Sequence, residues 1–223
     1  MNDPWLRRLD HLICEVPDIE HAMTLFAGLG FPVAWPIGRF WPYGLTAGVA
    51  LGGINLEFLQ LDEGSVAVAR IRTLVFEPID LHEAVATLEG LGLPMRISEK
   101  WEDDPEKLRL RGYSAVESQE RQLICRNAIP VEAPAIDFFL CDYSPALKAR
   151  LGPGTFPGLA PVREVVWGSP FAAVDADCLK FFGLAGVGPS LALKEWPERG
   201  VVEIRTDRGP IDLGSFAANF RFV

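Results

Sequence analysis

An arginine beside a group of aromatic residues is the first segment of this sequence with evident binding chemistry. Arg39 precedes three closely spaced aromatic residues, Phe40, Trp41 and Tyr43. A guanidinium presents paired N–H donors that fit a carboxylate in a bidentate manner. The segment is therefore a candidate substrate-binding site for a carboxylate. The aromatic residues fit either a pocket lid or simple hydrophobic packing, and the sequence leaves both interpretations open.

The three histidines lie in different surroundings. His11 lies in an apolar stretch, where an imidazole either serves chemistry or hydrogen-bonds a backbone carbonyl. His21 and His82 each neighbour a glutamate on the polar side of an expected helix, so we expect them to be solvated. The four cysteines form no CxxC pair, and we interpret them as buried small hydrophobic residues in a reducing compartment. They are Cys14, Cys125, Cys141 and Cys178.

Composition and charge exclude several classes of function. The chain has 223 residues, with 30 acidic and 21 basic residues and a net charge of −9. Nucleic acid is an unfavourable partner for such a chain, because phosphate contacts need a basic face. No apolar run reaches the ~20 residues that span a bilayer. No signal-peptide pattern opens the chain, so we expect a cytoplasmic protein. No phosphate-binding glycine loop or nicotinamide fingerprint is present, which argues against a nucleotide cofactor.

A repeated unit of strands and one helix would position these residues. In the first copy, Asp18 is the expected N-cap of a helix over residues 19–28. A short apolar stretch before it and three after it predict strands. These strands are expected over residues 9–16, 32–35, 44–51 and 54–61. The order is therefore β-α-β-β-β.

A second copy of the unit follows. It has an expected strand over residues 72–77 and a helix over 81–89, which Asp80 would cap. The segment Gly-Leu-Gly-Leu-Pro that ends this helix repeats the Gly-Leu-Gly-Phe-Pro that ends the first helix. Such self-similarity indicates an internal repeat. Residues 101–111 are expected to form a charged, solvated loop, and strands are expected over 121–127 and 135–141.

The last part of the chain predicts a third, shortened unit. Residues 143–161 are rich in glycine and proline and indicate a linker. A strand is expected over 162–167, a helix over 174–182, and two strands over 201–205 and 210–216 that pair through a turn. The predicted modules are residues 1–66, 67–142 and 162–223, which gives an α+β fold with helices on one face of mixed sheets.

Four short motifs stand out in the first unit, namely Leu-Asp-His-Leu at 9–12, Val-Pro-Asp-Ile at 16–19, Leu-Gly-Phe at 29–31 and Asn-Leu-Glu-Phe at 55–58. They resemble motifs of the vicinal oxygen chelate superfamily, in particular its glyoxalase-like proteins of the glyoxalase, bleomycin-resistance and dioxygenase type. The resemblance extends to residues 135–139 and to the closing hairpin over 206–213. The resemblance implies repeated βαβββ modules that form open, cupped mixed sheets around a metal site.

The resemblance also implies a set of metal ligands. By position it assigns His11 and Glu57 in the first unit and Glu164 in the third. One imidazole and two carboxylates suit a single divalent ion such as Zn, Ni, Mn or Fe. Glu57 or Glu164 would then act as the catalytic carboxylate that moves a proton. Other family ligand positions are blank here, since Phe139 and Gly214 occupy two of them and Phe40 replaces a histidine.

The implied function is metal-assisted lyase, isomerase or ring-cleavage chemistry on a small molecule that bears a carbonyl or carboxylate. The alternative is a non-catalytic protein of the same fold that binds or sequesters a small molecule and has a degenerate metal site. His11 with Glu57 favours the enzyme, whereas the blank ligand positions favour the binding protein. The third unit would leave a sheet edge unpaired, so a homodimer is also expected.

Overall fold

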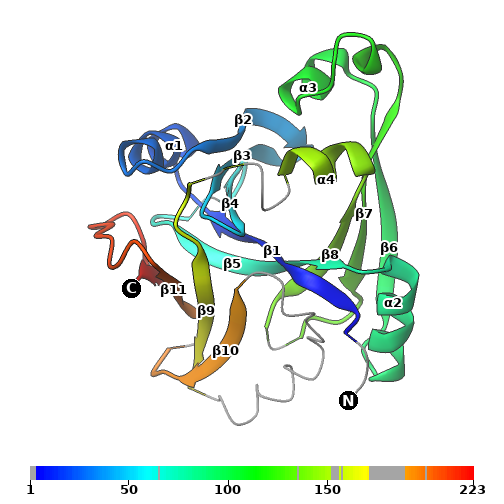
Figure 1. Ribbon diagram of the computed structural model, residues 1–223. Coiled ribbons are helices and arrows are strands. Elements are labelled where there is room, and N and C mark those ends of the chain that lie inside the picture. The colour runs from blue at the N-terminus through cyan, green and yellow to red at the C-terminus, as the bar shows by residue number, and fades with distance from the viewer. Residues whose placement is uncertain are drawn as a thin grey trace.

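The computed structural model describes residues 4–64, 66–134, 136–151, 156, 158–170, 189–198 and 200–223. These residues form two β-sheets with helices around them (Figure 1). The larger sheet has eight strands in the order β2-β3-β4-β1-β5-β8-β7-β6. The smaller sheet has four strands in the order β10-β9-β11-β12. This is an α+β architecture, as the sequence predicts.

The first half of the larger sheet is one βαβββ module. Its elements are β1 (Leu6–Glu15), α1 (Ile19–Gly28), β2 (Val33–Trp41), β3 (Gly44–Ala50) and β4 (Asn55–Leu61). β1 and β4 pair in parallel, and β3 lies antiparallel between β4 and β2. All five elements are those expected from the sequence, except that β2 continues six residues beyond the predicted Trp35, to Trp41.

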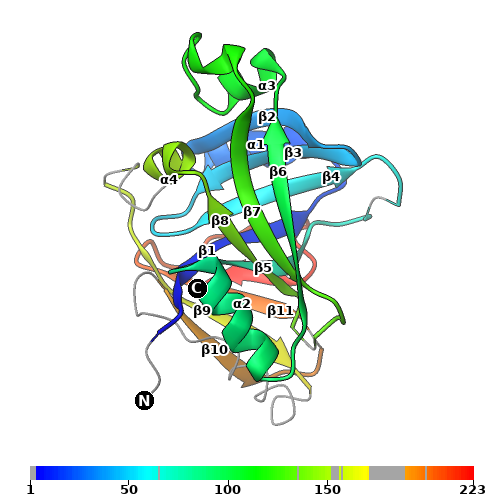
Figure 2. The same cartoon turned by 90° about the vertical axis from the view of Figure 1, so that its right-hand side faces the viewer.

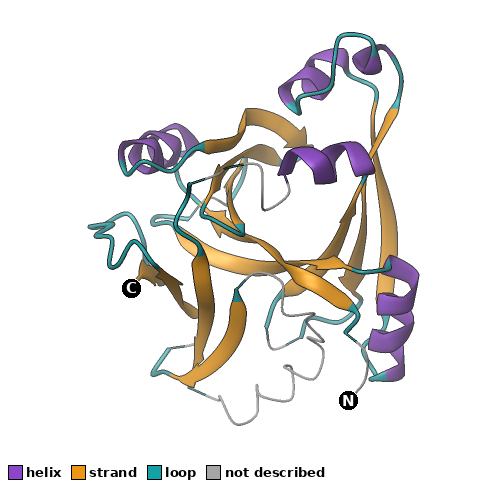
Figure 3. Ribbon diagram, in the orientation of Figure 1, coloured by secondary structure: helices purple, strands orange, loops and turns teal. Residues whose placement is uncertain are grey.

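The second half repeats this arrangement. It contains β5 (Arg70–Pro78), α2 (Leu81–Gly90), β6 (Met95–Glu102), α3 (Pro105–Leu110), a 3-10 turn over Glu117–Gln119, β7 (Gln122–Pro130) and β8 (Phe138–Tyr143). β1 and β5 pair antiparallel at the centre of the sheet, so the two modules continue each other and β2 and β6 are its edges. The sheet curls strongly, and α3 and α4 (Pro145–Leu151) lie on the side toward which it curls (Figures 1 and 3).

The two module helices begin and end in the same way, which explains the repeated sequence motif. The Asp18 side chain accepts a hydrogen bond at the start of α1, and Asp80 does so at the start of α2. After each helix a glycine adopts a left-handed conformation, with φ of 78° at Gly30 and 87° at Gly92. A side chain at either position would be strained. The Gly-Leu-Gly segments are therefore helix ends that the two modules share.

The smaller sheet belongs to the third unit and shares the main hydrophobic core. It consists of β9 (Val162–Ser169), β10 (Ser190–Glu195), β11 (Val201–Thr206) and β12 (Phe220–Phe222). The Phe222 ring on β12 contacts Phe26 of α1. It also stacks on the Phe31 ring, and the centroids of these two rings lie 5.6 Å apart. Figure 2 shows this sheet below the larger one. The expected homodimer stays a prediction.

Some predicted elements differ from the structure. Residues 210–216 do not form a strand that pairs with β11, because β12 takes that place in parallel. The stretch over 101–111, predicted as a loop, contains the end of β6 and α3, because Asp104 caps a helix that Pro105 begins. Strands β6 and β10 were not predicted, and α4 lies within the predicted linker. The helix expected over 174–182 lies outside the described residues.

The main core fills one face of the larger sheet, and the opposite, concave face carries a smaller apolar cluster. Phe58 of β4 and Leu74 of β5 lie in the main core, while Val75 and Tyr113 lie in the cluster on the concave side. The concave face is thus incompletely filled by apolar side chains. In the described part of the chain, no helix is both long and apolar enough to cross a membrane.

Candidate functional site

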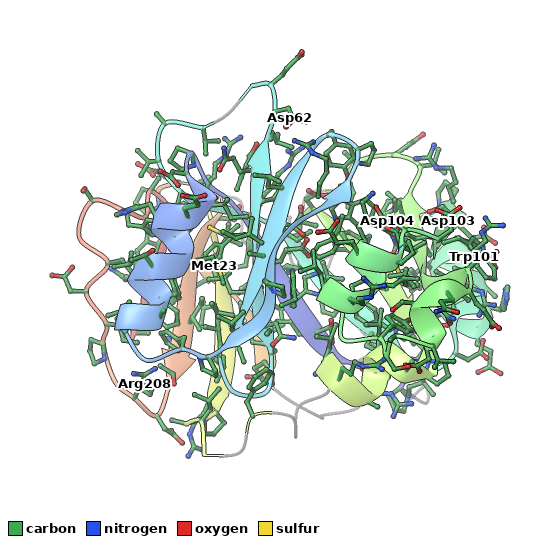
Figure 4. The ribbon with its side chains drawn as sticks, turned by 90° about the horizontal axis from the view of Figure 1, so that it is seen from above. Met23, Asp62, Trp101, Asp103, Asp104 and Arg208 are labelled. Atoms are coloured by element: carbon green, nitrogen blue, oxygen red, sulfur yellow. The ribbon has the colours of Figure 1, made fainter. Side chains whose placement is uncertain are left out.

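A cavity of about 220 Å³ lies on the concave face, between the two modules of the larger sheet. Both modules contribute side chains to its wall, and α3 and α4 lie beside it. Five aromatic residues, one acidic residue and several cations are among those that line it. They include Trp35, Phe40, Trp41, Phe139, Tyr143, Glu57, His11, Lys100, Arg111 and Arg150. Viewed from above, α3 and α4 lie on one side of β2–β4 and α1 lies on the other (Figure 4).

His11 and Glu57 meet in this cavity because β1 and β4 are parallel neighbours. Ile13 of β1 is aligned with Glu57 of β4, which brings the carboxylate near the His11 ring. His11 Nε2 lies 3.2 Å from Glu57 Oε2, and His11 Nδ1 lies 2.8 Å from Asp10 Oδ2. Burial opposes protonation of the imidazole, but the two carboxylates outweigh it and raise the pKa of His11 to about 9. His11 is therefore an imidazolium held between two carboxylates at neutral pH.

Behind His11, a buried ion-pair network fixes the orientation of Asp10. The Arg8 guanidinium donates hydrogen bonds to Asp10 and, at 2.8 Å, to Glu77 on β5. All three side chains are almost completely buried, with exposed fractions of 6% or less. Burial opposes ionisation of Asp10, yet His11 and Arg8 together hold the pKa of its carboxyl below its usual range. The network thus joins the two modules through β1 and β5.

Lys100 and Arg111 place two cations at the point where the edge strands approach each other. Lys100 lies on β6, and its ammonium donates a hydrogen bond to the carbonyl of Phe40 on the opposite edge strand, β2. The same ammonium lies 3.4 Å from the centroid of the Trp41 ring. The Arg111 guanidinium follows α3 and lies 4.3 Å from the centroid of Phe40. Both cations therefore rest on aromatic faces of β2.

Neither cation has a carboxylate partner within ion-pair distance in the part of the chain that the structure describes. The Arg111 Nε atom is buried and has no hydrogen-bond partner there. Burial and, to a lesser extent, the charge of Arg111 together lower the pKa of Lys100 to about 8. Burial also lowers the pKa of Arg111. Both side chains are partly buried, and charges withdrawn from water without counterions are costly, so this end of the cavity favours an anion.

Two of the four cysteines lie in the cavity wall. Cys125 of β7 and Cys141 of β8 line the cavity. Hydrogen bonding from Cys141 lowers the pKa of the Cys125 thiol, and burial raises the pKa of Cys141 well above its usual value. Cys14 is buried elsewhere in the main core, as expected for a small hydrophobic residue. Cys178 lies outside the described residues.

The structure brings together some of the sequence-predicted site residues and separates others. His11, Glu57, Phe40 and Trp41 all line the cavity. Glu164 does not join them, because it lies on β9 in the smaller sheet, where its carboxylate pairs with the Arg205 guanidinium. The expected metal site needed the first and third modules to face each other, whereas the first module pairs with the second.

The remaining predicted substrate-binding residues lie at the surface. Arg39 forms a bidentate pair with Asp62, at 2.7 and 2.8 Å, and about half of each side chain is exposed. Figure 4 labels Asp62, which lies just after β4 and away from α3 and α4. Tyr43 is 52% exposed and stacks on Trp41, with ring centroids 6.0 Å apart. Arg39 alternates with Phe40 along β2, which explains why one faces solvent and the other the cavity.

Asp10, Lys100 and Arg111 were not predicted as site residues. Lys100 and Arg111 belong to a charged stretch that is typical of a solvated surface, and no local pattern distinguishes them from Lys107 or Arg109. Asp10 was available as a signal, since an acidic residue directly before His11 in an apolar strand is unusual.

The donor set does not fit a catalytic divalent metal. His11 Nε2 and Glu57 Oε2 are the two atoms that could share an ion, but a catalytic site of this kind uses three protein ligands. No group of three histidine, cysteine, aspartate or glutamate side chains among the described residues is placed to hold an ion. Phe139 occupies the β8 position beside His11, with ring centroids 6.5 Å apart. The cations Lys100 and Arg111 add repulsion.

The sequence matches no family model and no curated protein. The fold is similar to that of several solved structures. A hypothetical protein from Staphylococcus aureus matches with a TM-score of 0.68 and 10% identity over 96% of this chain and 98% of that one. A mutant of 4-hydroxymandelate synthase from Streptomyces coelicolor matches with a TM-score of 0.60 and 13% identity, over 91% and 71% of the two chains.

A variant of homoprotocatechuate 2,3-dioxygenase from B. fuscum matches with a TM-score of 0.52 and 12% identity, over 92% of this chain and 58% of that one. This chain therefore spans less than two thirds of the length of the dioxygenase. Together with the paired βαβββ modules, these similarities establish that the chain has the fold of the vicinal oxygen chelate superfamily. Identities this low define the fold and leave the chemistry to the site itself.

Proposed function

We propose that the protein binds a small aromatic carboxylate in the cavity between its two modules, as a binding or sequestering protein. The observation that carries this proposal is the pair of partly buried cations, Lys100 and Arg111, neither of which has a carboxylate partner within ion-pair distance among the described residues. A bound carboxylate would supply the missing counterion. Arg111 is the better-suited receptor, since a guanidinium can bind both carboxylate oxygens.

The lining of the cavity supports an aromatic ligand. Phe40, Trp41 and Phe139 are among the lining residues, and Glu57 is the only acidic side chain among the described ones. Aromatic faces pack well against another planar ring. The volume of about 220 Å³ lies below the roughly 300–1,000 Å³ of pockets for drug-sized ligands. The ligand is accordingly expected to contain a single ring.

Metal-assisted lyase, isomerase or ring-cleavage chemistry is the second candidate, and the contact between His11 and Glu57 is the observation that favours it. Elemental analysis of the purified, untagged protein tests this candidate. We expect well below one equivalent of transition metal, because a two-donor site flanked by cations binds ions weakly. One equivalent in the wild type that is lost in His11→Ala would establish the metal candidate instead.

The proposed binding function predicts a defined charge dependence. Titration calorimetry should show binding of benzoate or 4-methylbenzoate, and no binding of benzamide, which has nearly the same shape but no charge. The Arg111→Met variant should bind benzoate about 10- to 100-fold more weakly, because a hydrogen bond to a charged group contributes roughly 1.5–3 kcal/mol. Tryptophan fluorescence offers a second readout, since Trp41 lines the cavity.

The matched control is Arg39→Met, which removes the arginine that the sequence alone predicts as the carboxylate ligand. Arg39 is paired with Asp62 at the surface, so we expect this variant to bind benzoate like the wild type. Equal binding of benzoate and benzamide would contradict the proposal. Loss of binding in Arg39→Met with full binding in Arg111→Met would instead assign the carboxylate to Arg39.

A further inference from the structure

We propose that Lys100 forms an imine with an aldehyde or ketone group of the ligand, so that the cavity captures small aromatic oxo-carboxylates covalently and reversibly. This inference rests on the proposed function, because Arg111 must hold the carboxylate of the same molecule. It adds a chemical class to that function, namely an aromatic ring that bears both a carboxylate and a carbonyl group.

The contacts of Lys100 distinguish it from the other described lysines. Lys148 bridges Asp142 and Glu77, at 2.7 and 3.5 Å, and Lys107 lies 4.0 Å from Asp104 at the surface. Lys194 is exposed at the end of β10. Lys100 is the described lysine that lines the cavity, and among the described residues its ammonium contacts the Phe40 carbonyl and the Trp41 ring. Lys100 thus lies in the cavity wall, and none of the described carboxylates lies within ion-pair distance of its amine.

The electrostatic surroundings favour a neutral amine at Lys100. Burial and the Arg111 charge lower the pKa of its ammonium to about 8, against the weaker opposing effects of Cys125, Glu57 and Glu102. At pH 7 roughly a tenth of the amine is then neutral, whereas an ordinary lysine with a pKa near 10.4 is almost wholly protonated. A desolvated lysine beside a second cation is a recognised arrangement for amine nucleophiles.

The reaction balances without an added oxidant or reductant. The neutral Lys100 amine attacks the carbonyl carbon, a C–N bond forms, and the π electron pair of the carbonyl moves to oxygen, which takes up a proton. The nitrogen loses a proton to solvent, and the resulting hydroxyl takes up a second proton and leaves as water when the C–O bond breaks. The C=N bond forms at the same time, and the nitrogen gives its second proton to solvent. The net change is amine plus carbonyl to imine plus water, and hydrolysis reverses it. Arg111 would hold the carboxylate throughout, which makes the addition effectively unimolecular.

Borohydride trapping with 4-carboxybenzaldehyde as the probe tests the inference. The protein is incubated with the probe at pH 7, reduced with sodium borohydride, and examined by intact mass spectrometry and peptide mapping. We expect one reduced adduct per chain, on Lys100, with at least tenfold less adduct from benzaldehyde, which lacks the carboxylate. Peptide mapping that places the reduced adduct on Lys100 distinguishes capture by the amine from reaction at the Cys125 thiol.

The key variant is Lys100→Arg, which retains the charge and a donor for the Phe40 carbonyl but cannot form an imine. It should lose the specific adduct while it keeps its thermal unfolding temperature, and Lys107→Arg should retain the adduct. Adducts spread over surface lysines, or an unchanged adduct in Lys100→Arg, would overturn the inference.

Calorimetry with 4-methylbenzoate, which lacks the carbonyl, separates this inference from the proposed function. Binding of 4-methylbenzoate without specific trapping of the aldehyde overturns imine formation and leaves the proposed function intact. Absence of both binding and trapping overturns the proposed function and this inference with it. Binding together with Lys100-specific trapping supports both.

Discussion

The Arg8→Met variant is expected to lose about 3–5 kcal/mol of unfolding free energy, since it removes one partner of a buried ion-pair network. Methionine fills similar volume, so the loss is mainly electrostatic. Asp10 and Glu77 would both keep their burial and lose the guanidinium that compensates their charges. Urea unfolding followed by circular dichroism measures the change in the midpoint at constant slope.

The neighbouring arginine supplies a matched control for this variant. Arg7 contacts the same carboxylate, Glu77, at 3.3 Å, but half of its side chain is exposed. Exposed ion pairs contribute roughly 0–1 kcal/mol, so Arg7→Met should be close to the wild type in stability. Equal effects of the two substitutions would show that the buried network does not hold the two modules together in the way that its geometry indicates.

The stability of the protein is also expected to fall by about 2 kcal/mol between pH 6 and pH 8, through His11 alone. The imidazole has a pKa of about 9 in the fold and about 6.5 when unfolded. Protonation therefore favours the folded state, and its contribution is complete below the unfolded pKa and is lost as the pH rises through the folded one. Urea unfolding free energies at intervals of half a pH unit measure this slope.

A His11→Gln variant isolates this contribution, because glutamine occupies a similar volume and does not titrate. The difference in unfolding free energy between the two proteins should shrink as the pH rises from 6 to 8. The comparison also cancels other groups, among them Lys100, whose lowered pKa acts in the opposite direction as the pH rises through about 8. A difference that is constant across this range would mean that His11 is not held as an imidazolium between Asp10 and Glu57.

The parts of the fold predicted from sequence are those that local chemistry specifies. Helix capping by a side chain is one such feature, and it identifies Asp18 and Asp80. A positive φ at the helix end is another, and it identifies Gly30 and Gly92. Few residue types meet either requirement. The strand predicted over 210–216 failed because its partner is chosen by packing: Phe222 stacks on Phe31, and this places β12 beside β11. The hydrophobic periodicity of one segment does not determine which distant strand it pairs with.

The same distinction applies to the candidate site. His11 and Glu57 belong to one module and lie on adjacent parallel strands, so the pattern within that module could identify both. Lys100 and Arg111 reach the cavity only because the second module curls back until β6 approaches β2. A residue pattern that describes each module separately cannot show this approach. Glu164 was assigned to the site on the assumption that modules one and three face each other, and the topology pairs modules one and two.

The two halves of the curled sheet meet where β2 approaches β6, and they contribute different charged groups to the cavity. The first half supplies the carboxylate of Glu57 and the imidazole of His11, and the second supplies the cations Lys100 and Arg111. Backbone pairing between β1 and β5 joins the two halves of the sheet. A change of ligand charge or shape can therefore arise by substitution in one half while the other keeps its sequence. Duplication of one module, followed by different substitutions in the two copies, would give a symmetric backbone whose cavity binds a ligand in one orientation.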